Sequence, residues 1–230
     1  MRDIHSHILP GIDDGPATVE KSMEMLAAAK AAGVSSIVCT PHVRDPYFDY
    51  DAFWEAFWLL KKHAKGFPLK MGFEVNHTMF MQLGMDWADK LCFDGSNDFL
   101  LELSTRASAY EYGVFERTIF ELRSRGYRVI IAHPERYEAI QQDINLAHDL
   151  VRWGAALQVS ADYIVGGRTG ASKKPAQRLF KEGLVSFLAS DAHIPEHYDY
   201  LAKARSMHKP LGAYANLNRS AAVSALQRTG

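Results

Sequence analysis

Short apolar runs rich in β-branched residues alternate along the chain with longer segments of helical periodicity. The runs that read as strands are Asp3–His5, Val34–Thr40, Leu69–Glu74, Phe99–Leu103, Arg128–Ala132, Ala156–Ser160 and Val185–Ser190. Alternation of this kind is typical of repeated βα units built around a parallel sheet. The pattern therefore predicts an α/β fold with seven units.

The segments between the runs carry apolar residues at helical spacing and end at glycine. In the first segment, an apolar stripe is expected from Val19, Met23, Leu26 and Ala27, before Gly33. Seven such units predict a closed or nearly closed barrel, somewhat smaller than the eight-unit standard of roughly 250 residues. An open doubly wound sheet is the alternative, but the chain lacks the glycine-rich phosphate loops that usually accompany it.

Composition and charge narrow the class of protein. A chain of 230 residues, 47% hydrophobic and 23% charged, fits one domain over residues 1–230. The net charge of -1 gives no basic field, so a nucleic-acid partner is not expected. The charged start and the short apolar runs predict neither a signal peptide nor a membrane segment. With only Cys39 and Cys92, the sequence favours a reducing cytoplasmic location.

Metal-ligating side chains stand where the predicted strands end. In a parallel barrel, these ends share one rim, so distant residues converge there. Several carboxylates would repel one another unless cations neutralised them, and imidazoles supply further ligands. The sequence therefore predicts a polynuclear metal site. Its candidate ligands are His5, His7, Asp14, His42, Glu74, Glu102, His133, Asp191 and His193.

The other five histidines are interpreted as structural. They lie in helical or polar stretches, at His63, His77, His148, His197 and His208. His77 and His197 are close enough in sequence to the rim to support ligands, although their spacing does not require this role.

The charge of such a site indicates its chemistry. Four carboxylates with two or three divalent ions would leave a pocket that is neutral or positive and attracts an anion. Paired metals activate water and hold a phosphoryl oxygen, which predicts phosphoester hydrolysis. Arg136 stands just past the rim and can clamp phosphate, unless it pairs with Glu135 or Glu138. Arg44 is a second candidate for binding substrate.

Other hydrolase chemistries are disfavoured by spacing. A cysteine phosphatase needs C-x5-R, but only four residues separate Cys39 from Arg44, and no arginine stands at that spacing after Cys92. The nucleophile elbow G-x-S-x-G is absent, as is the C-x-x-C of zinc ribbons and redox motifs.

Six blocks of sequence resemble the PHP (polymerase and histidinol phosphatase) superfamily over almost the whole chain. The first block closely resembles the opening of manganese-dependent protein tyrosine phosphatases found with bacterial capsule and exopolysaccharide genes. The blocks are Asp3–Pro16, Thr40–His42, Gly72–Glu74, Leu101–Glu102, Ile131–Tyr137 and Ala189–His193. The resemblance implies a distorted, TIM-like (β/α)7 barrel around three metals.

The resemblance also implies how the ligands are shared. His5, His7, Glu74 and Asp191 would hold one ion, and Glu74 would bridge to a second ion held by Glu102 and His133. Asp14, His42 and His193 would hold the third. Manganese is the favoured ion, with iron, zinc and magnesium as alternatives.

The implied reaction is protein-tyrosine phosphatase chemistry on a bacterial tyrosine kinase. A metal-bridging hydroxide would attack phosphorus, with Arg136, Asp191 and His193 as catalytic residues and the kinase's phosphotyrosine tail as partner. Family members often carry an arginine in a Gly-Arg-Pro-Pro-like stretch soon after Asp-x-His, whereas here Ile194–Tyr198 follows. Arg44 or Arg168 could replace that arginine.

Three alternatives use the same residues differently. A small-molecule phosphatase, such as a histidinol phosphatase, would use the same pocket. A PHP nuclease would need a basic track leading to the rim. A binding module that retains metals only for stability is disfavoured because all nine ligand positions are filled.

Overall fold

Nine parallel strands form two sheets in the computed structural model, which describes residues 1–168 and 170–208. The first sheet has the order β1-β2-β4, and the second has the order β3-β5-β6-β7-β8-β9. The strands are β1 Arg2–Ser6, β2 Ser36–Cys39, β3 His42–Val43, β4 Leu69–Met71, β5 Glu74–Asn76, β6 Asp98–Glu102, β7 Arg128–Ala132, β8 Ala156–Ser160 and β9 Val185–Ala189.

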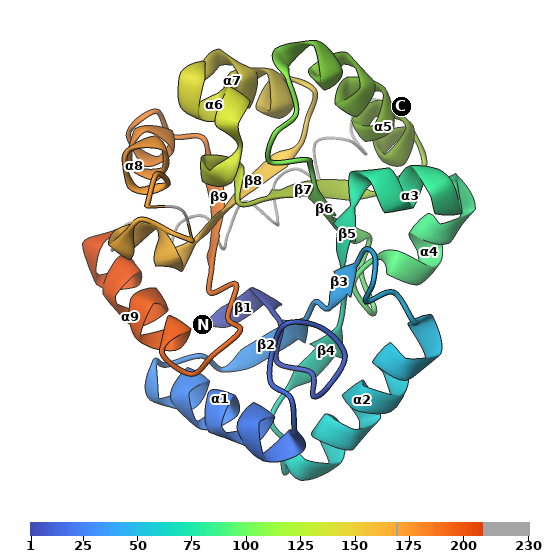
Figure 1. The fold of residues 1–230 in the computed structure, drawn as a ribbon, viewed down its shortest axis with the longest axis vertical. Helices are drawn as coiled ribbons and strands as arrows, with labels where there is room; N and C mark the ends of the chain where they lie inside the picture. Colours follow the sequence, from blue (N-terminus) through green and yellow to red (C-terminus); the bar gives the residue numbers. More distant parts are fainter. Residues whose placement is uncertain (169, 209–230) are drawn as a thin grey trace, which may run out of the picture.

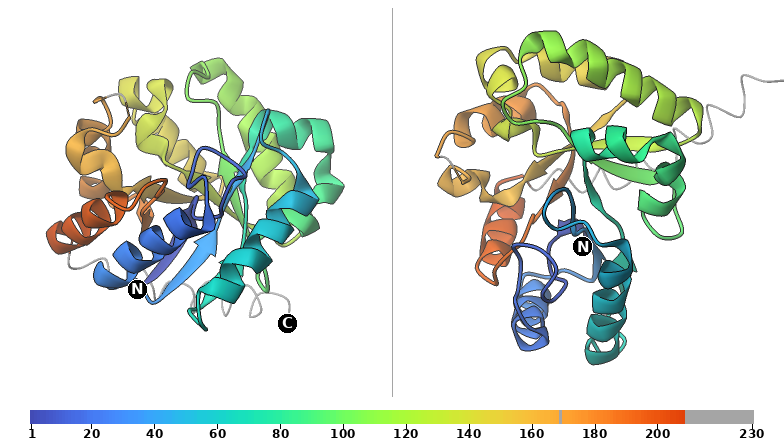
Figure 2. Two further views of the ribbon diagram at one scale, coloured as in Figure 1. Left: turned by 60° about the horizontal axis from the view of Figure 1, so that its bottom comes forward. Right: turned by 45° about the vertical axis from the view of Figure 1, so that its right-hand side comes forward.

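Helices surround the strands in chain order, and α9 returns beside α1 (Figure 1). Both further views show the helices on the outside (Figure 2). The α-helices are α1 Val19–Ala31, α2 Tyr50–His63, α3 His77–Leu83, α4 Ala88–Leu91, α5 Tyr112–Ser124, α6 Glu138–Gln142, α7 Asn145–Arg152, α8 Lys173–Lys181 and α9 His197–Met207. Short 3-10 turns are η1 Met85–Trp87, η2 Ala109–Glu111, η3 Pro134–Arg136 and η4 Ala161–Val165.

The two sheets meet where β1, the first strand, approaches the segment that follows β9, the last strand. Ser6 bridges Ala192 in parallel, and the Asp191 N–H donates to His5 O at 2.9 Å. The predicted distorted, TIM-like barrel of seven βα units is confirmed. The prediction of one domain over 1–230 includes residues 169 and 209–230, which lie outside the described residues.

The third predicted strand, Leu69–Glu74, is divided into β4 and β5. Gly72 lies at the division, and a Cβ there would stand 2.5 Å from Phe93 and 2.6 Å from Val38. The glycine therefore lets the chain cross between the sheets at close approach. Residues on both sides stay paired to the preceding unit, with Gly72 N–H donating to Cys39 O and Glu74 N–H donating to Pro41 O. The division places Glu74 at the start of β5.

The first helix forms as expected but buries a different face. Thr18 caps it by accepting from Lys21 N–H. The buried residues are Ser22, Met25, Leu26 and Ala29. The predicted stripe is therefore wrong except at Leu26: Val19 and Met23 are half-buried, and Ala27 is exposed. Because alanine side chains are small, they determine only weakly which face of the helix is buried. Ser22 can be buried because its hydroxyl donates to Thr18 O.

Both cysteines are free, and Cys39 is fully buried in β2. Burial raises the pKa of the Cys39 thiol, which makes it unreactive. Within residues 1–168 and 170–208, no helix combines the length and apolar character needed to cross a membrane.

Candidate metal centre and phosphate site

The first strand points two imidazoles at two buried carboxylates. His5 Nε2 lies 3.4 Å from Glu74 Oε1 and 3.4 Å from Asp191 Oδ1. His7 Nε2 lies 3.3 Å from Glu74 Oε2 and from the same Asp191 oxygen. Donor atoms from β1, β5 and the segment after β9 therefore face a common centre, as expected where carboxyl ends of strands share a rim.

Glu74 also contacts imidazoles on its other side. His133 Nε2 lies 2.7 Å from Glu74 Oε1, and His42 Nδ1 lies 2.7 Å from Glu74 Oε2. Glu102 Oε1 lies 3.8 Å from His133 Nε2. Because one carboxylate touches four imidazoles, it has the geometry of a bridging ligand.

Asp14 completes the outer part of the cluster. Its Oδ1 lies 3.2 Å from His42 Nε2 and 3.1 Å from His193 Nε2. The loop that carries it folds tightly over β1, because a Cβ on Gly15 would stand only 2.1 Å from His7 O. Only glycine fits there, so the Asp-Asp-Gly sequence is what brings Asp14 to the ligands.

The structure brings together all nine predicted ligands. Three groups have donor atoms within 4.8 Å of one another: His7, Asp14, His42 and His193; His5, His7 and Glu74; His42, Glu74 and Glu102. These groups overlap the sharing that the resemblance implies, but they place His42, rather than His133, with Glu74 and Glu102. The division of ligands among individual ions stays a prediction.

The chemistry of the donors fits divalent cations. His133 Nδ1 is buried with no hydrogen-bond partner among the described residues, and His42 Nδ1 and Glu74 Oε2, although 2.7 Å apart, are buried and form no hydrogen bond. An unsatisfied buried polar atom costs about 1–3 kcal/mol, which a cation bound by that atom would offset. Mixed imidazole and carboxylate sets accept manganese, iron, zinc or magnesium.

Although burial disfavours their charged forms, the neighbouring carboxylates raise the pKa values of His5, His7 and His42, so that without metal, protons balance the negative charge that cations would neutralise. Burial alone would raise the pKa of Glu74, but the imidazoles of His5 and His42 hold it well below its usual value. Burial, together with the charge of His7, lowers the pKa of His193 to about 4. Glu74 is therefore ionised and His193 neutral near pH 7, which are the forms that bind metal.

Two ligand positions have strained backbones. His133 has φ 33° and Asp191 has φ 49°, both in the left-handed region that favours glycine. Such conformations cost about 1–3 kcal/mol and persist where the surrounding structure fixes them, often at functional sites. Here the strain turns the chain immediately after β7 and β9, so that both side chains face the cluster.

Two polar residues that were not predicted hold the imidazoles in place. Asp13 Oδ2 contacts His7 Nδ1 at 2.8 Å and accepts from His42 N–H at 3.2 Å. Gln158 Oε1 lies 2.8 Å from His5 Nδ1. Contacts of this kind fix the ring orientation and free the other nitrogen for metal. A glutamine at an inward position of an apolar strand was the available signal for Gln158.

Arg136 lies against the cluster in a different way from the one expected. Its Nη2 forms an ion pair with Asp191 Oδ2 at 2.5 Å and donates to Asp162 Oδ2 at 3.1 Å. The alternative partners, Glu135 and Glu138, are not its recorded contacts in the part of the chain that the structure describes. Asp162 was not predicted as a site residue because it follows β8, and no candidate ligand was identified at the end of that strand.

Arg44 and Arg168 approach the Asp14 side of the cluster from separate loops. Arg44 Nη2 donates to His42 Nε2 at 2.9 Å, and Arg168 Nη2 donates to His193 Nε2 at 2.8 Å. Both guanidinium groups are also within 3.7 Å of an Asp14 oxygen. With Arg136, they place three positive charges beside the predicted metal ligands.

The remaining histidines have other partners. His63 contacts Leu59 O, His77 contacts Thr118, His148 contacts Glu182, and His208 contacts Tyr163. His197 is different, because its Nδ1 accepts from His193 N–H at 3.3 Å. It therefore supports the segment that carries two predicted ligands.

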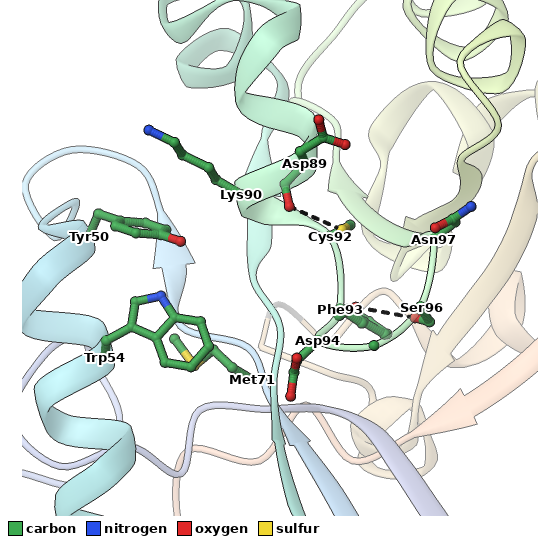
Figure 3. A pocket seen from close by; sticks show the side chains of 11 residues that line it. Tyr50, Trp54, Met71, Asp89, Lys90, Cys92, Phe93, Asp94, Ser96 and Asn97 are labelled. Carbon is green, nitrogen blue, oxygen red and sulfur yellow. Dashed lines mark hydrogen bonds between the residues drawn. The ribbon is translucent and has the colours of Figure 1, made fainter.

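Two cavities differ in their relation to the cluster. One, of about 580 Å³, is lined by His133, Glu102 and Arg136, together with outer residues. The other, of about 520 Å³, lies between α2, α4 and the loop that precedes β6, and is lined by Tyr50 and Trp54 among others (Figure 3). Only the first includes predicted site residues, so it is the candidate substrate cavity.

Two similar proteins are named as tyrosine-protein phosphatases, one of them as putative. A putative tyrosine-protein phosphatase CapC of Staphylococcus aureus is 30% identical over 93% of this chain and 85% of its own length. The tyrosine-protein phosphatase YwqE of Bacillus subtilis is 32% identical over 84% of this chain and 77% of its own.

A solved structure supports the same relationship. It comes from work on YwqE of Bacillus subtilis and CpsB of Streptococcus pneumoniae, described as unique metal-dependent tyrosine phosphatases. It is 28% identical with a TM-score of 0.74, covering 89% of this chain and 84% of that chain. The family model for capsular polysaccharide synthesis, CpsB/CapC, matches residues 1–210. The chain therefore belongs to the CpsB/CapC family.

Proposed function

We propose that this protein is a metal-dependent phosphatase that hydrolyses phosphotyrosine in a protein substrate. The observation that carries the proposal is the convergence of nine imidazole and carboxylate side chains beside Arg136, of which Glu102 and His133 line the cavity of about 580 Å³. The names of its relatives, which are tyrosine-protein phosphatases, support this choice of substrate. The proposed ions are two or three, with manganese favoured.

Residues of this chain would bind and orient the phosphate. Divalent ions, when bound, would activate water and polarise a phosphoryl oxygen. Asp191 and Asp162 fix the Arg136 guanidinium from one side, which leaves its second terminal nitrogen free to donate to phosphate. His193 stays neutral, since burial lowers its pKa to about 4. The tyrosine leaving group, with a pKa of about 10, departs with little help from a general acid.

The proposed partner is the phosphotyrosine tail of a bacterial tyrosine kinase, and the proposed location is the cytoplasm. The family's description as capsular polysaccharide synthesis supports the first part. The two unpaired cysteines fit a reducing compartment and support the second.

A comparison of substrates on purified, manganese-loaded protein tests this function. We expect hydrolysis of phosphotyrosine peptides to exceed that of histidinol phosphate, and chelation to abolish it. A strong preference for histidinol phosphate, or chelator-sensitive release of nucleotides from DNA, would instead indicate a small-molecule phosphatase or a nuclease. Metal binding without any hydrolysis would indicate a binding module.

A further inference from the structure

The substrate cavity continues outward from the predicted ligands as a groove with many arginines. Its lining includes four arginines, from four separate segments: Arg44, Arg106, Arg136 and Arg168. The carboxylates in the lining are Glu102, which belongs to the cluster, and Glu138. Among the lining residues the four arginines therefore outnumber the two carboxylates, although the whole chain has a net charge of -1.

The four arginines differ widely in exposure. Their side chains are 14% exposed at Arg136, 31% at Arg44, 49% at Arg168 and 87% at Arg106. The first three contact cluster residues, whereas Arg106 does not. A single phosphate therefore has sufficient partners without Arg106, which points to a different role for the outermost arginine.

The outer part of the groove is well placed to receive residues that flank a phosphotyrosine. Arg106 lies in the segment between β6 and η2, which is joined to α6 because Glu138 N–H donates to Thr105 O at 2.9 Å. Gln141 and Gln142 of α6 line the same wall. The whole cavity has a volume of about 580 Å³, which lies within the roughly 300–1,000 Å³ range of ligand pockets and is larger than phosphate alone requires.

Arg106 is also free to change partners. Its recorded partner is Glu138, at 3.9 Å, and that side chain is 60% exposed. Exposed pairs of this kind contribute little in water. A carboxylate on a bound peptide could replace Glu138 at small cost.

We propose that Arg106, with the glutamines of α6, selects substrates that carry acidic residues next to the phosphotyrosine. This inference rests on the proposed function, since it assigns the sequence that surrounds the phosphate to the outer groove. Arg106 is a specificity-determining residue in this account, not a catalytic one. Long-range attraction by the four arginines would also speed the approach of an acidic peptide.

Three phosphotyrosine peptides test the proposal, with glutamate, glutamine or lysine on both sides of the same phosphotyrosine. With manganese-loaded protein, we expect kcat/KM for the glutamate peptide to exceed that for the glutamine peptide by about fivefold at low salt. The lysine peptide should be the poorest, and added salt should reduce the differences. Binding of non-hydrolysable phosphonate versions, followed by fluorescence anisotropy, should give the same order.

Charge reversal provides the sharper variant, because Arg106 is too exposed for its replacement to threaten folding. Arg106→Glu should reverse the order, so that the lysine peptide becomes the preferred one. Arg152→Glu is the matched control: this exposed arginine ends α7, which leads into the amino end of β8, and the same charge reversal there should leave the order unchanged.

The possible failures are distinct. If neither p-nitrophenyl phosphate nor any of the peptides is hydrolysed, the proposed function fails, and this inference fails with it. If p-nitrophenyl phosphate and all three peptides are hydrolysed but without preference, or if Arg106→Glu leaves the order unchanged, only the specificity inference is overturned. Displacement of bound peptide by a single-stranded oligonucleotide at similar concentration would overturn it in favour of a nucleic-acid groove.

Discussion

Two cavities among the described residues have similar volumes but very different linings. The substrate cavity, of about 580 Å³, combines predicted metal ligands with four arginines. The side cavity, of about 520 Å³, is lined by aromatic residues, two aspartates and one lysine (Figure 3). The difference teaches that volume alone does not indicate a site in this protein. What matters is that the first cavity lies where parallel strands end and bring ligands together.

The largest expected effect comes from removing the central ligand of the cluster. Glu74→Gln keeps the shape of the side chain but removes the charge that faces four imidazoles. We expect bound metal to fall sharply and phosphatase activity to fall by about 10³-fold, because the metals supply several kcal/mol of transition-state stabilisation. Metal analysis and steady-state kinetics measure both effects. Full activity at normal metal content would show that Glu74 is dispensable.

A smaller loss is expected from Arg136. Arg136→Lys keeps the charge but loses the two-bond fork that can bind phosphate, so kcat/KM should fall by about 10²-fold. Metal content should stay unchanged, which separates this effect from that of Glu74. Inhibition by inorganic phosphate should weaken in parallel. If inhibition is unaltered, Arg136 does not bind the phosphate.

Replacing a residue that orients a metal ligand should have a smaller effect, mainly on metal affinity. Gln158→Met removes the contact with His5 Nδ1 at similar side-chain size. We expect a tenfold or greater loss of metal affinity, in the range of roughly 10–100-fold known for such contacts. Excess manganese should restore much of the activity. Activity that excess metal does not restore would contradict an orienting role.

His77 is a buried imidazole outside the ligand cluster, and it tests whether burial alone is sufficient to make a functional site. It contacts Thr118, and burial lowers its pKa from 6.5 to about 4. Between these values the unfolded chain binds the proton more readily, so stability falls as pH decreases. From pH 7 to pH 5, the contribution of His77 to the free energy of unfolding should fall by about 2 kcal/mol. Urea unfolding of metal-free protein measures it, and His77→Gln should show a correspondingly smaller loss.

The side cavity should give the smallest effect on activity. Lys90 lines it and packs over Trp87 at 4.5 Å. Lys90→Ala should change kcat/KM by less than about twofold, because this residue is remote from the cluster and surface substitutions are usually mild. A large loss with unchanged stability would mean that the two cavities are coupled.

Much of the site could be predicted because barrel topology converts position along the chain into position in space. His5, Glu74 and Asp191 are far apart in sequence, but each closes or follows a predicted strand, although the structure places Glu74 at the start of β5. Their convergence follows from a parallel barrel alone. The division of the third strand could not be foreseen, because it depends on how closely Phe93 packs against Gly72.

The supporting residues were harder to predict for a related reason. Asp13, Gln158 and Asp162 act through contacts with other side chains, and such contacts depend on packing rather than on strand position. The buried face of α1 was missed because its alanines fit either side of a helix, so the neighbouring elements determine which side is covered.

Anomalous diffraction from crystals grown with manganese tests the central claim most directly. The account predicts strong peaks among the nine ligands, with one beside Glu74 and both of its oxygens engaged. Well-ordered ligands with no anomalous peak between them, in protein that still hydrolyses phosphotyrosine, would contradict it.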